Sequence, residues 1–297
     1  MTPFLDRLHE RKVLVADGAM GTMLFQRGLT PGECPERINL EHPDILEEIA
    51  RLYVAAGAEI IQTNTFGGSP LKLAMYHLED KTEEINIAAV RAARKGANGQ
   101  TFIAASCGPC ARLLKPHGDT EPAEVLAGFE RQISALVSEK IDMISVETMT
   151  DLHEAILAVR AAKAVAPSLP VSAAMTFDST PRGFYTIMGV TVEQAAKGLA
   201  DAGADIIGSN CGNGIENMIG IAAEFRKYTD LPILIRPNAG LPRMTEGVLI
   251  YPESPQFMAE KCKEMLQLGV SILGGCCGTT PEHIAALRSE VERYLSG

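Results

Sequence analysis

Three cysteines stand at points where apolar stretches end, and their type and spacing indicate metal chemistry. Cys276 and Cys277 are adjacent and follow the apolar run 270–273 through a pair of glycines. Cys211 follows a second apolar run at 206–207. Zinc prefers thiolate ligands in tetrahedral geometry, and a catalytic zinc site keeps one coordination position open. Because flanking glycines let the backbone turn, we expect these thiols to hold one zinc ion rather than to serve as small buried residues.

A zinc ion held by three thiolates leaves the site with one net negative charge, which limits the chemistry that it supports. Such a site is too rich in electrons to activate water strongly, but it can bind an incoming thiol and hold it as a thiolate at neutral pH. That property suits transfer of an alkyl group to a substrate sulfur and suits hydrolysis poorly. The six histidines are scattered and form no His-x-x-x-His pair, so we expect none of them to be a ligand.

Polar residues at other predicted strand ends could bind a substrate beside the metal. Glu147 and Asp17 each end an apolar run, where an unpaired carboxylate is costly to bury. Each could recognise a substrate ammonium or form a structural salt bridge, and both interpretations stay open at this point. The amides of Gly18 and Ala19, in the turn after Asp17, could receive a substrate carboxylate or could form a tight turn without a ligand.

Cys107 and Cys110 flank a Gly-Pro pair and match the string of a thioredoxin-type redox motif. Redox chemistry at such a pair needs a thiol held near a helix N-terminus in a small and quite different fold. Because the rest of the chain indicates a barrel, a redox protein is the lesser alternative to a metal site.

The elements that must position these residues are apolar strands separated by segments of helical period. Most of the strand candidates are nearly continuous apolar runs, as expected of strands covered on both faces. They are Val13–Ala16, Glu59–Thr63, Phe102–Ser106, Asp142–Val146, Pro170–Thr176, Asp205–Ser209, Pro232–Arg236 and Val270–Gly274. Thr191 with Gln194 indicates a capping box before one helix, and Thr280 with Pro281 indicates the start of another.

This alternation of strand and helix over 297 residues predicts a single-domain (β/α)8 TIM barrel, whose strand carboxyl ends carry the site. We expect the barrel to span residues 1–297, with a short amphipathic helix over residues 1–10. A doubly wound sheet is the competing fold, but Asp17–Thr22 does not match the Gly-x-Gly-x-x-Gly turn of that fold. The connection 17–43 is long, and long connections are often functional lids.

Composition and charge exclude several classes of function. The chain is 46% hydrophobic and has a formal net charge of −10 with no run of Lys or Arg, so neither a nucleic acid nor an anionic membrane surface is an expected partner. No apolar stretch approaches the roughly 20 residues of a membrane span, and the charged N-terminus does not look like a signal peptide. Seven irregularly spaced cysteines indicate thiols or metal ligands rather than disulfides, so we expect a cytoplasmic protein.

The residues singled out so far together resemble the zinc-dependent homocysteine S-methyltransferases over essentially the whole chain. The motifs that carry the resemblance are Asp17–Thr22, Asn64–Phe66, Glu147–Thr148, Asn210–Gly212, Pro237–Pro242 and Gly274–His283. The Gly-Gly-Cys-Cys-Gly-Thr-Thr-Pro segment with an upstream Asn-Cys-Gly is highly specific. Within the family, the chain is most similar to the N-terminal homocysteine-binding module of cobalamin-dependent methionine synthase.

The resemblance implies a (β/α)8 barrel that methylates homocysteine to methionine. Its zinc ligands would be Cys211, Cys276 and Cys277, with the homocysteine sulfur as the fourth ligand. Asn238 would lie close to the metal and occupy the open position when substrate is absent. The homocysteine ammonium would meet Glu147 and Asp17, and its carboxylate would meet amides of the turn after Asp17. Substrate contacts are therefore expected at Asp17, Gly18, Ala19, Ser106, Glu147 and Asn238.

The methyl donor is the open part of this prediction, because the resemblance covers a single module and the chain carries no folate or cobalamin domain. We expect methylcobalamin on a corrinoid protein or module, and the chain could itself be a fragment of a larger enzyme. S-methylmethionine and betaine are alternative donors. Betaine is disfavoured because quaternary ammonium groups prefer aromatic cages, and the chain has no Trp and only 5% aromatic residues. A non-catalytic zinc-binding or thiol-binding barrel is an alternative of a different class.

Overall fold

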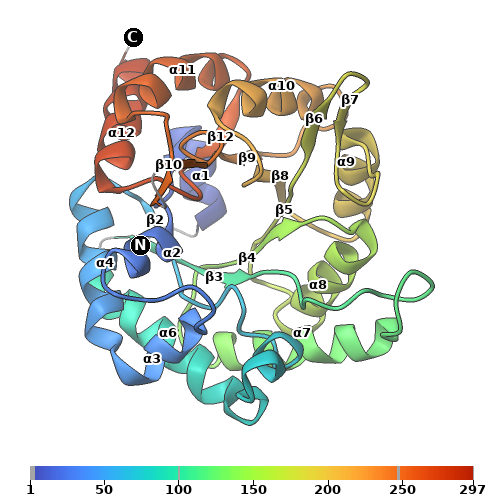
Figure 1. The fold of residues 1–297 in the computed structure, drawn as a ribbon. Coiled ribbons are helices and arrows are strands. Elements are labelled where there is room, and N and C mark those ends of the chain that lie inside the picture. Colours follow the sequence, from blue (N-terminus) through green and yellow to red (C-terminus); the bar gives the residue numbers. More distant parts are fainter. Residues whose placement is uncertain (1–3, 100, 246–247, 297) are drawn as a thin grey trace.

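Eight parallel strands form a ring in the computed structural model, which describes residues 4–99, 101–245 and 248–296 (Figure 1). In order around the ring they are β1 Leu14–Val15, β2 Ile60–Gln62, β3 Phe102–Cys107, β4 Met143–Met149, β5 Val171–Met175, β8 Ile206–Asn210, β9 Ile233–Arg236 and β12 Val270–Leu273. A parallel bridge between Ala16 and Ile60 closes the ring between β1 and β2. Each strand overlaps one of the predicted strands, and the predicted (β/α)8 barrel is confirmed.

Long helices connect successive strands and cover the outside of the ring (Figure 1). They are α4 Pro43–Ala55, α6 Thr82–Ala97, α7 Pro122–Val137, α8 Leu152–Val165, α9 Val192–Asp201, α10 Ile215–Arg226, α11 Pro255–Gln267 and α12 Pro281–Ser296. The predicted capping box of Thr191 and Gln194 starts α9, and α12 begins at Pro281 as predicted. Within the described residues, no helix is long and apolar enough to cross a membrane.

The inside of the ring is apolar at its amino-terminal end and becomes polar towards the other end. Helix α1, Phe4–Arg11, closes the apolar end. The rings of Phe4 and Phe102 meet edge to face there with centroids 5.2 Å apart, and Leu8 joins the same cluster. The predicted helix over residues 1–10 therefore corresponds to α1 in part, since residues 1–3 lie outside the described residues. The apolar plug leaves the opposite end of the ring for polar chemistry.

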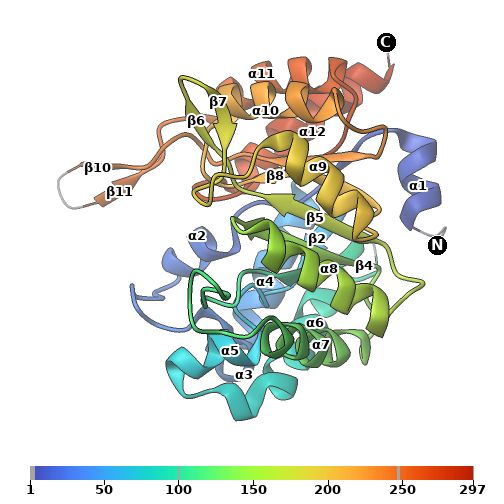
Figure 2. The same cartoon turned by 90° about the vertical axis from the view of Figure 1, so that its right-hand side faces the viewer.

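Insertions between the barrel elements gather at that opposite end. Two antiparallel hairpins that the sequence did not predict pair β6 (Asp178–Thr180) with β7 (Gly183–Tyr185), and β10 (Arg243–Thr245) with β11 (Val248–Ile250). Figure 2 shows both hairpins away from α1, with β10 and β11 projecting farthest. The shorter pieces of the connections are α2 Met20–Phe25, η1 Pro35–Arg37, α3 Ile38–Glu41, α5 Pro70–Leu73, η2 Ala74–Tyr76 and η3 Glu79–Lys81. These insertions surround the strand ends, where a barrel carries its site.

Candidate active site

The three predicted thiols meet at the carboxyl ends of β8 and β12. The sulfur atoms of Cys211 and Cys277 are 3.8 Å apart, and the sulfurs of Cys211, Cys276 and Cys277 all lie within 4.8 Å of one another. Thiolates about 2.3 Å from a tetrahedral zinc ion are ~3.8 Å from each other. The spacing of the thiols therefore fits a single zinc ion without rearrangement of the strands.

Unusual backbone conformations bring these thiols together. Cys211 has a φ of 62° and Gly278 a φ of 81°, so the chain turns sharply just after β8 and just after the Cys276–Cys277 pair. A non-glycine residue in the left-handed region is strained and persists where its surroundings over-determine it. Here the Cys211 amide donates to the Arg236 carbonyl at 3.1 Å, and the Cys276 amide donates to the Pro237 carbonyl at 2.8 Å. Backbone hydrogen bonds to the end of β9 thus fix both turns.

The thiols share one negative charge among themselves. Hydrogen bonds from Cys276 and Cys277 lower the pKa of Cys211 to about 3. The hydrogen bond to Cys211 in turn raises the pKa of Cys277 to about 11 and raises the pKa of Cys276 well above its ordinary value. Because three thiolates at this distance repel one another, ionisation of all of them requires a cation between them.

Asn238 follows β9 beside the thiols, and its side chain has capacity for one more ligand. A hydrogen bond from Asn238 contributes to the low pKa of Cys211. The Asn238 side chain is 4% exposed, and among the described residues no donor reaches its buried Oδ1 atom. An orphaned amide oxygen next to a thiol cluster is the arrangement expected of an atom that can complete a metal's coordination.

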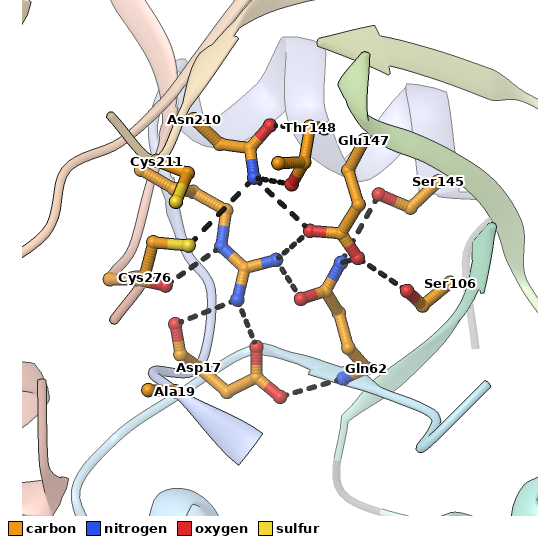
Figure 3. Close-up of polar contacts among 12 residues, drawn as sticks. Asp17, Ala19, Gln62, Ser106, Ser145, Glu147, Thr148, Asn210, Cys211 and Cys276 are labelled. Atoms are coloured by element: carbon orange, nitrogen blue, oxygen red, sulfur yellow. Dashed lines mark hydrogen bonds and ion pairs between the residues drawn. The ribbon is translucent and has the colours of Figure 1, made fainter. Parts of the chain in front are cut away.

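A buried charge cluster occupies the polar end of the barrel interior beside the thiols (Figure 3). Arg236 donates from Nη2 to Asp17 Oδ1 at 2.9 Å, and its Nη1 atom lies 3.7 Å from Glu147 Oε2. Gln62 links the same two carboxylates, since its amide donates to Asp17 Oδ2 at 2.7 Å and its Nε2 to Glu147 Oε1 at 2.9 Å. Burial raises the pKa of Asp17 to about 6, against the lowering effect of Arg236.

Glu147 is held from two neighbouring strands. Ser106, on β3, donates its hydroxyl to Glu147 Oε1, and Asn210 Nδ2, on β8, reaches Glu147 Oε2 at 3.4 Å. The same Asn210 amide donates to Thr148 Oγ1 at 2.7 Å and approaches the Cys276 sulfur at 3.8 Å. Thr148 has a φ of 59°, a rare conformation for a β-branched residue. Asn210 therefore ties the carboxylate site to the thiol site.

The turn after Asp17 packs against the segment that follows Cys277. The Ala19 amide donates to Thr279 Oγ1 at 3.1 Å, so this amide already has a protein partner. A Cβ at Gly18 would lie 2.7 Å from Thr279 Oγ1 and 2.8 Å from the Tyr53 hydroxyl, so the position has no room for a side chain. The predicted contacts at Gly18 and Ala19 thus lie beside the thiols, with Gly18 held small by packing.

Comparison with known proteins then identifies the family. The family model described as homocysteine S-methyltransferase matches residues 14–291. The chain belongs to the homocysteine S-methyltransferase family. The resemblance found in its motifs is confirmed by this match.

Relatives and solved structures agree with that assignment. Methionine synthases of Mycobacterium leprae and Mycobacterium tuberculosis are each 32% identical to this homocysteine S-methyltransferase family member, over 100% and 98% of the chain. The chain spans only 26% and 25% of those relatives. The homocysteine methyltransferase MmuM from Escherichia coli, in its metallated form, has the same fold, with a TM-score of 0.81, 24% identity, and coverage of 97% of this chain and 99% of that one.

The remaining cysteines of this S-methyltransferase family member are buried structural residues. In the described part of the chain, the group of ligand atoms close enough for a metal contains neither Cys107 nor Cys110. Burial raises the pKa of Cys107 above its ordinary value and that of Cys110 to about 12. Glu154 accepts a hydrogen bond from the Cys110 amide at 2.7 Å. Buried thiols with raised pKa values are poor nucleophiles, so this geometry does not favour the redox alternative.

Several residues of the site were missing from the sequence prediction. Gln62 and Arg236 lie inside predicted strands, and Asn210 and Thr148 lie inside predicted motifs, but none was predicted as a site residue. Tyr251, after β11, was not considered; a Cβ at Gly278 would overlap its ring. The available signal for Gln62 and Arg236 was a long polar side chain in an otherwise apolar strand, which indicates a polar partner inside the barrel.

Proposed function

We propose that this chain is a homocysteine-binding barrel that uses zinc held by Cys211, Cys276 and Cys277 to methylate homocysteine to methionine. The observation that carries the proposal is the thiol cluster, with its 3.8 Å sulfur separation, next to a buried pocket that holds two carboxylates. A thiol-bearing amino acid has one group for each of these features. Its sulfur suits the metal, and its ammonium suits the carboxylates.

The protein groups divide the work around that metal. A zinc ion bound by the three thiolates lowers the pKa of an incoming thiol, so that the thiol is held as a nucleophilic thiolate at neutral pH. Asn238 would yield its position near the thiols to the substrate sulfur. Asn210 keeps Glu147 at a fixed distance from Cys276 through the hydrogen bonds of its side-chain amide. In this arrangement the substrate ammonium and sulfur are oriented together, which reduces the entropic cost of methyl transfer.

We infer that the methyl group comes from methylcobalamin on a corrinoid protein or module. The similarity to methionine synthases, of which this chain spans about a quarter, supports a donor that is carried elsewhere. In the transfer, a lone pair of the homocysteine sulfur forms the S–CH3 bond, and the methyl–cobalt bond breaks with both electrons left on cobalt. The thiol proton leaves before this step. Such free-thiol chemistry needs a reducing compartment, as the cytoplasm is.

A panel of methyl donors tests the proposal. Zinc-loaded protein under reducing conditions is incubated with homocysteine and methylcobalamin, S-methylmethionine or betaine, and methionine is measured by mass spectrometry. We expect methionine from methylcobalamin and none from betaine, with Cys276→Ser as the inactive control. Methionine from S-methylmethionine alone would replace the corrinoid donor with a sulfonium donor. Homocysteine binding without product from any donor would indicate a non-catalytic thiol-binding barrel.

A further inference from the structure

The two buried carboxylates of the pocket are not equivalent, because one guanidinium serves them unequally. Arg236 is 4% exposed. Its Nη2 atom donates to Asp17 Oδ1 at 2.9 Å and to the Asp17 carbonyl at 3.3 Å, and its Nε donates to the Gly275 carbonyl at 3.1 Å. Its nearest approach to Glu147 is 3.7 Å, beyond ordinary hydrogen-bond length. Asp17 is therefore the main counter-ion of Arg236.

Asp17 has no oxygen left for a substrate. Its Oδ1 atom accepts from Arg236 and its Oδ2 atom accepts from the Gln62 amide at 2.7 Å. The side chain is 1% exposed, so solvent does not compete for either oxygen. A substrate ammonium could reach Asp17 only by displacing one of these charge-assisted or backbone hydrogen bonds.

Glu147, in contrast, keeps one oxygen lightly used. Its Oε1 atom accepts from Gln62 Nε2 at 2.9 Å and from the Ser106 hydroxyl. Within the described residues, its Oε2 atom has only Asn210 Nδ2 at 3.4 Å and Arg236 at 3.7 Å. Glu147 is also 8% exposed, more than Asp17. Two carboxylates against one guanidinium leave a net negative charge in a dry pocket, and such a charge is costly unless a cation joins it.

We propose that Arg236 decides which carboxylate recognises the substrate: it takes Asp17 as its own counter-ion and leaves Glu147 Oε2 to receive the substrate ammonium. This inference rests on the proposed function, since it assumes that the ligand is an amino-acid thiol. Arg236 is a positioning residue that acts through the carboxylates. Asp17, which the family resemblance had placed at the ammonium, becomes part of the barrel's internal ion pair.

The test compares homocysteine with 4-mercaptobutyrate, which has the same thiol and carboxylate but lacks the ammonium. Dissociation constants for both are measured by calorimetry on zinc-loaded protein. We expect the wild-type protein to prefer homocysteine by about tenfold or more, the worth of a charged hydrogen bond. Glu147→Gln should abolish that preference. The matched control Glu154→Gln, at another buried carboxylate outside the pocket, should retain it.

The paired variant Asp17→Asn with Arg236→Gln separates the roles of the two carboxylates. It removes one charge of each sign, so Glu147 still leaves a single net negative charge, and we expect the preference for homocysteine to stay within about threefold of wild type. Loss of the preference to the level of Glu147→Gln would overturn the proposal. If this variant does not fold, Asp17→Leu with Arg236→Met, of similar volume, replaces it in the same comparison.

Thermal unfolding provides a second readout. Arg236→Gln alone leaves Asp17 without its counter-ion and should lower the melting temperature, and adding Asp17→Asn should restore part of the loss, whereas additive losses would contradict the pairing. Arg236→Lys should keep the homocysteine preference because it keeps the charge. Homocysteine binding without methionine formation in the wild type would refute the proposed function and leave this inference intact. Methionine formation with loss of the preference in the paired variant would do the reverse.

Discussion

The carboxylate of Asp17 and the guanidinium of Arg236 meet at 2.9 Å inside the barrel, although 219 positions separate them in the chain. Asp17 follows β1 and Arg236 ends β9, so the ring brings the two charges together across its interior. Burial raises the pKa of Asp17 from 3.8 to about 6 in spite of this partner. The desolvation cost of the carboxylate thus exceeds what the guanidinium returns, as is common for buried ion pairs.

This pKa predicts how Asp17 changes stability with pH. Because its pKa is higher in the folded state (about 6) than in the unfolded state (3.8), the folded state holds an extra proton between these values. The contribution of Asp17 is fully present below pH 4 and is lost as pH rises through 6, a decrease of about 3 kcal/mol. Urea unfolding of wild type and Asp17→Asn at pH 4 to 7 should show their stability difference moving by this amount against the wild type. A difference that is constant with pH would contradict the raised pKa.

Removal of the Asn238 side chain should weaken zinc retention only while substrate is absent. The orphaned Oδ1 atom is the protein's candidate for the fourth ligand, and Asn238→Ala deletes it. We expect a chelator to remove zinc about tenfold faster from this variant than from wild type, in the range seen when groups supporting a metal are lost. Saturating homocysteine should abolish the difference because its sulfur fills the same position. Equal release rates without homocysteine would show that Asn238 is no ligand.

Cys107 and Cys110 should behave as inert core residues. Both are fully buried, and their raised pKa values keep them as thiols at pH 8. Iodoacetamide should therefore leave them unmodified in the native zinc-loaded protein and label them in denaturant, as mapped by peptide mass spectrometry. Rapid labelling, or a disulfide between them under mild oxidation, would support the redox alternative.

Gly208 tests how tightly the strands of the barrel pack. A Cβ at this position would overlap the carbonyl oxygen of Leu234 on the neighbouring strand β9, and a backbone atom cannot move aside as a flexible side chain can. Gly208→Ala should lower the free energy of unfolding by about 3 kcal/mol or more. As a control, Gly128→Ala in helix α7 meets nothing closer than 3.5 Å and should stabilise by about 0.5–1 kcal/mol. Similar effects of the two substitutions in chemical denaturation would contradict this packing.

Local sequence pattern was sufficient to predict the ring of strands. Apolar runs such as Pro170–Thr176 and Asp205–Ser209 correspond to β5 and β8, because strands covered on both faces must be apolar along their whole length. The hairpins β6–β7 and β10–β11 were missed because their short strands lie in polar connections. Tyr185 and Arg243, for example, carry no periodic burial signal.

Residue type predicted the thiols of the site, whereas its charge network needed the fold. Cys211 and the Cys276–Cys277 pair are unusual residues among glycines, so they could be recognised one by one. The partnership of Arg236 with Asp17 depends on which side chains face each other across the ring, and no local pattern encodes that relation. The sequence for this reason left open whether Asp17 and Glu147 bind substrate or form a salt bridge, and the structure distinguishes the two by their partners.

The most direct measurement is the zinc content and coordination of the purified protein. Under reducing conditions, we expect about one zinc ion per chain, with three sulfur ligands in the X-ray absorption spectrum, as a zinc site built from three cysteine thiolates requires. Cys211→Ser should lose this zinc to a chelator that leaves the wild type loaded, whereas Cys262→Ala, at a buried thiol in α11, should retain it. Wild-type protein that binds no zinc, or Cys211→Ser protein that retains it as tightly as wild type, would contradict the account.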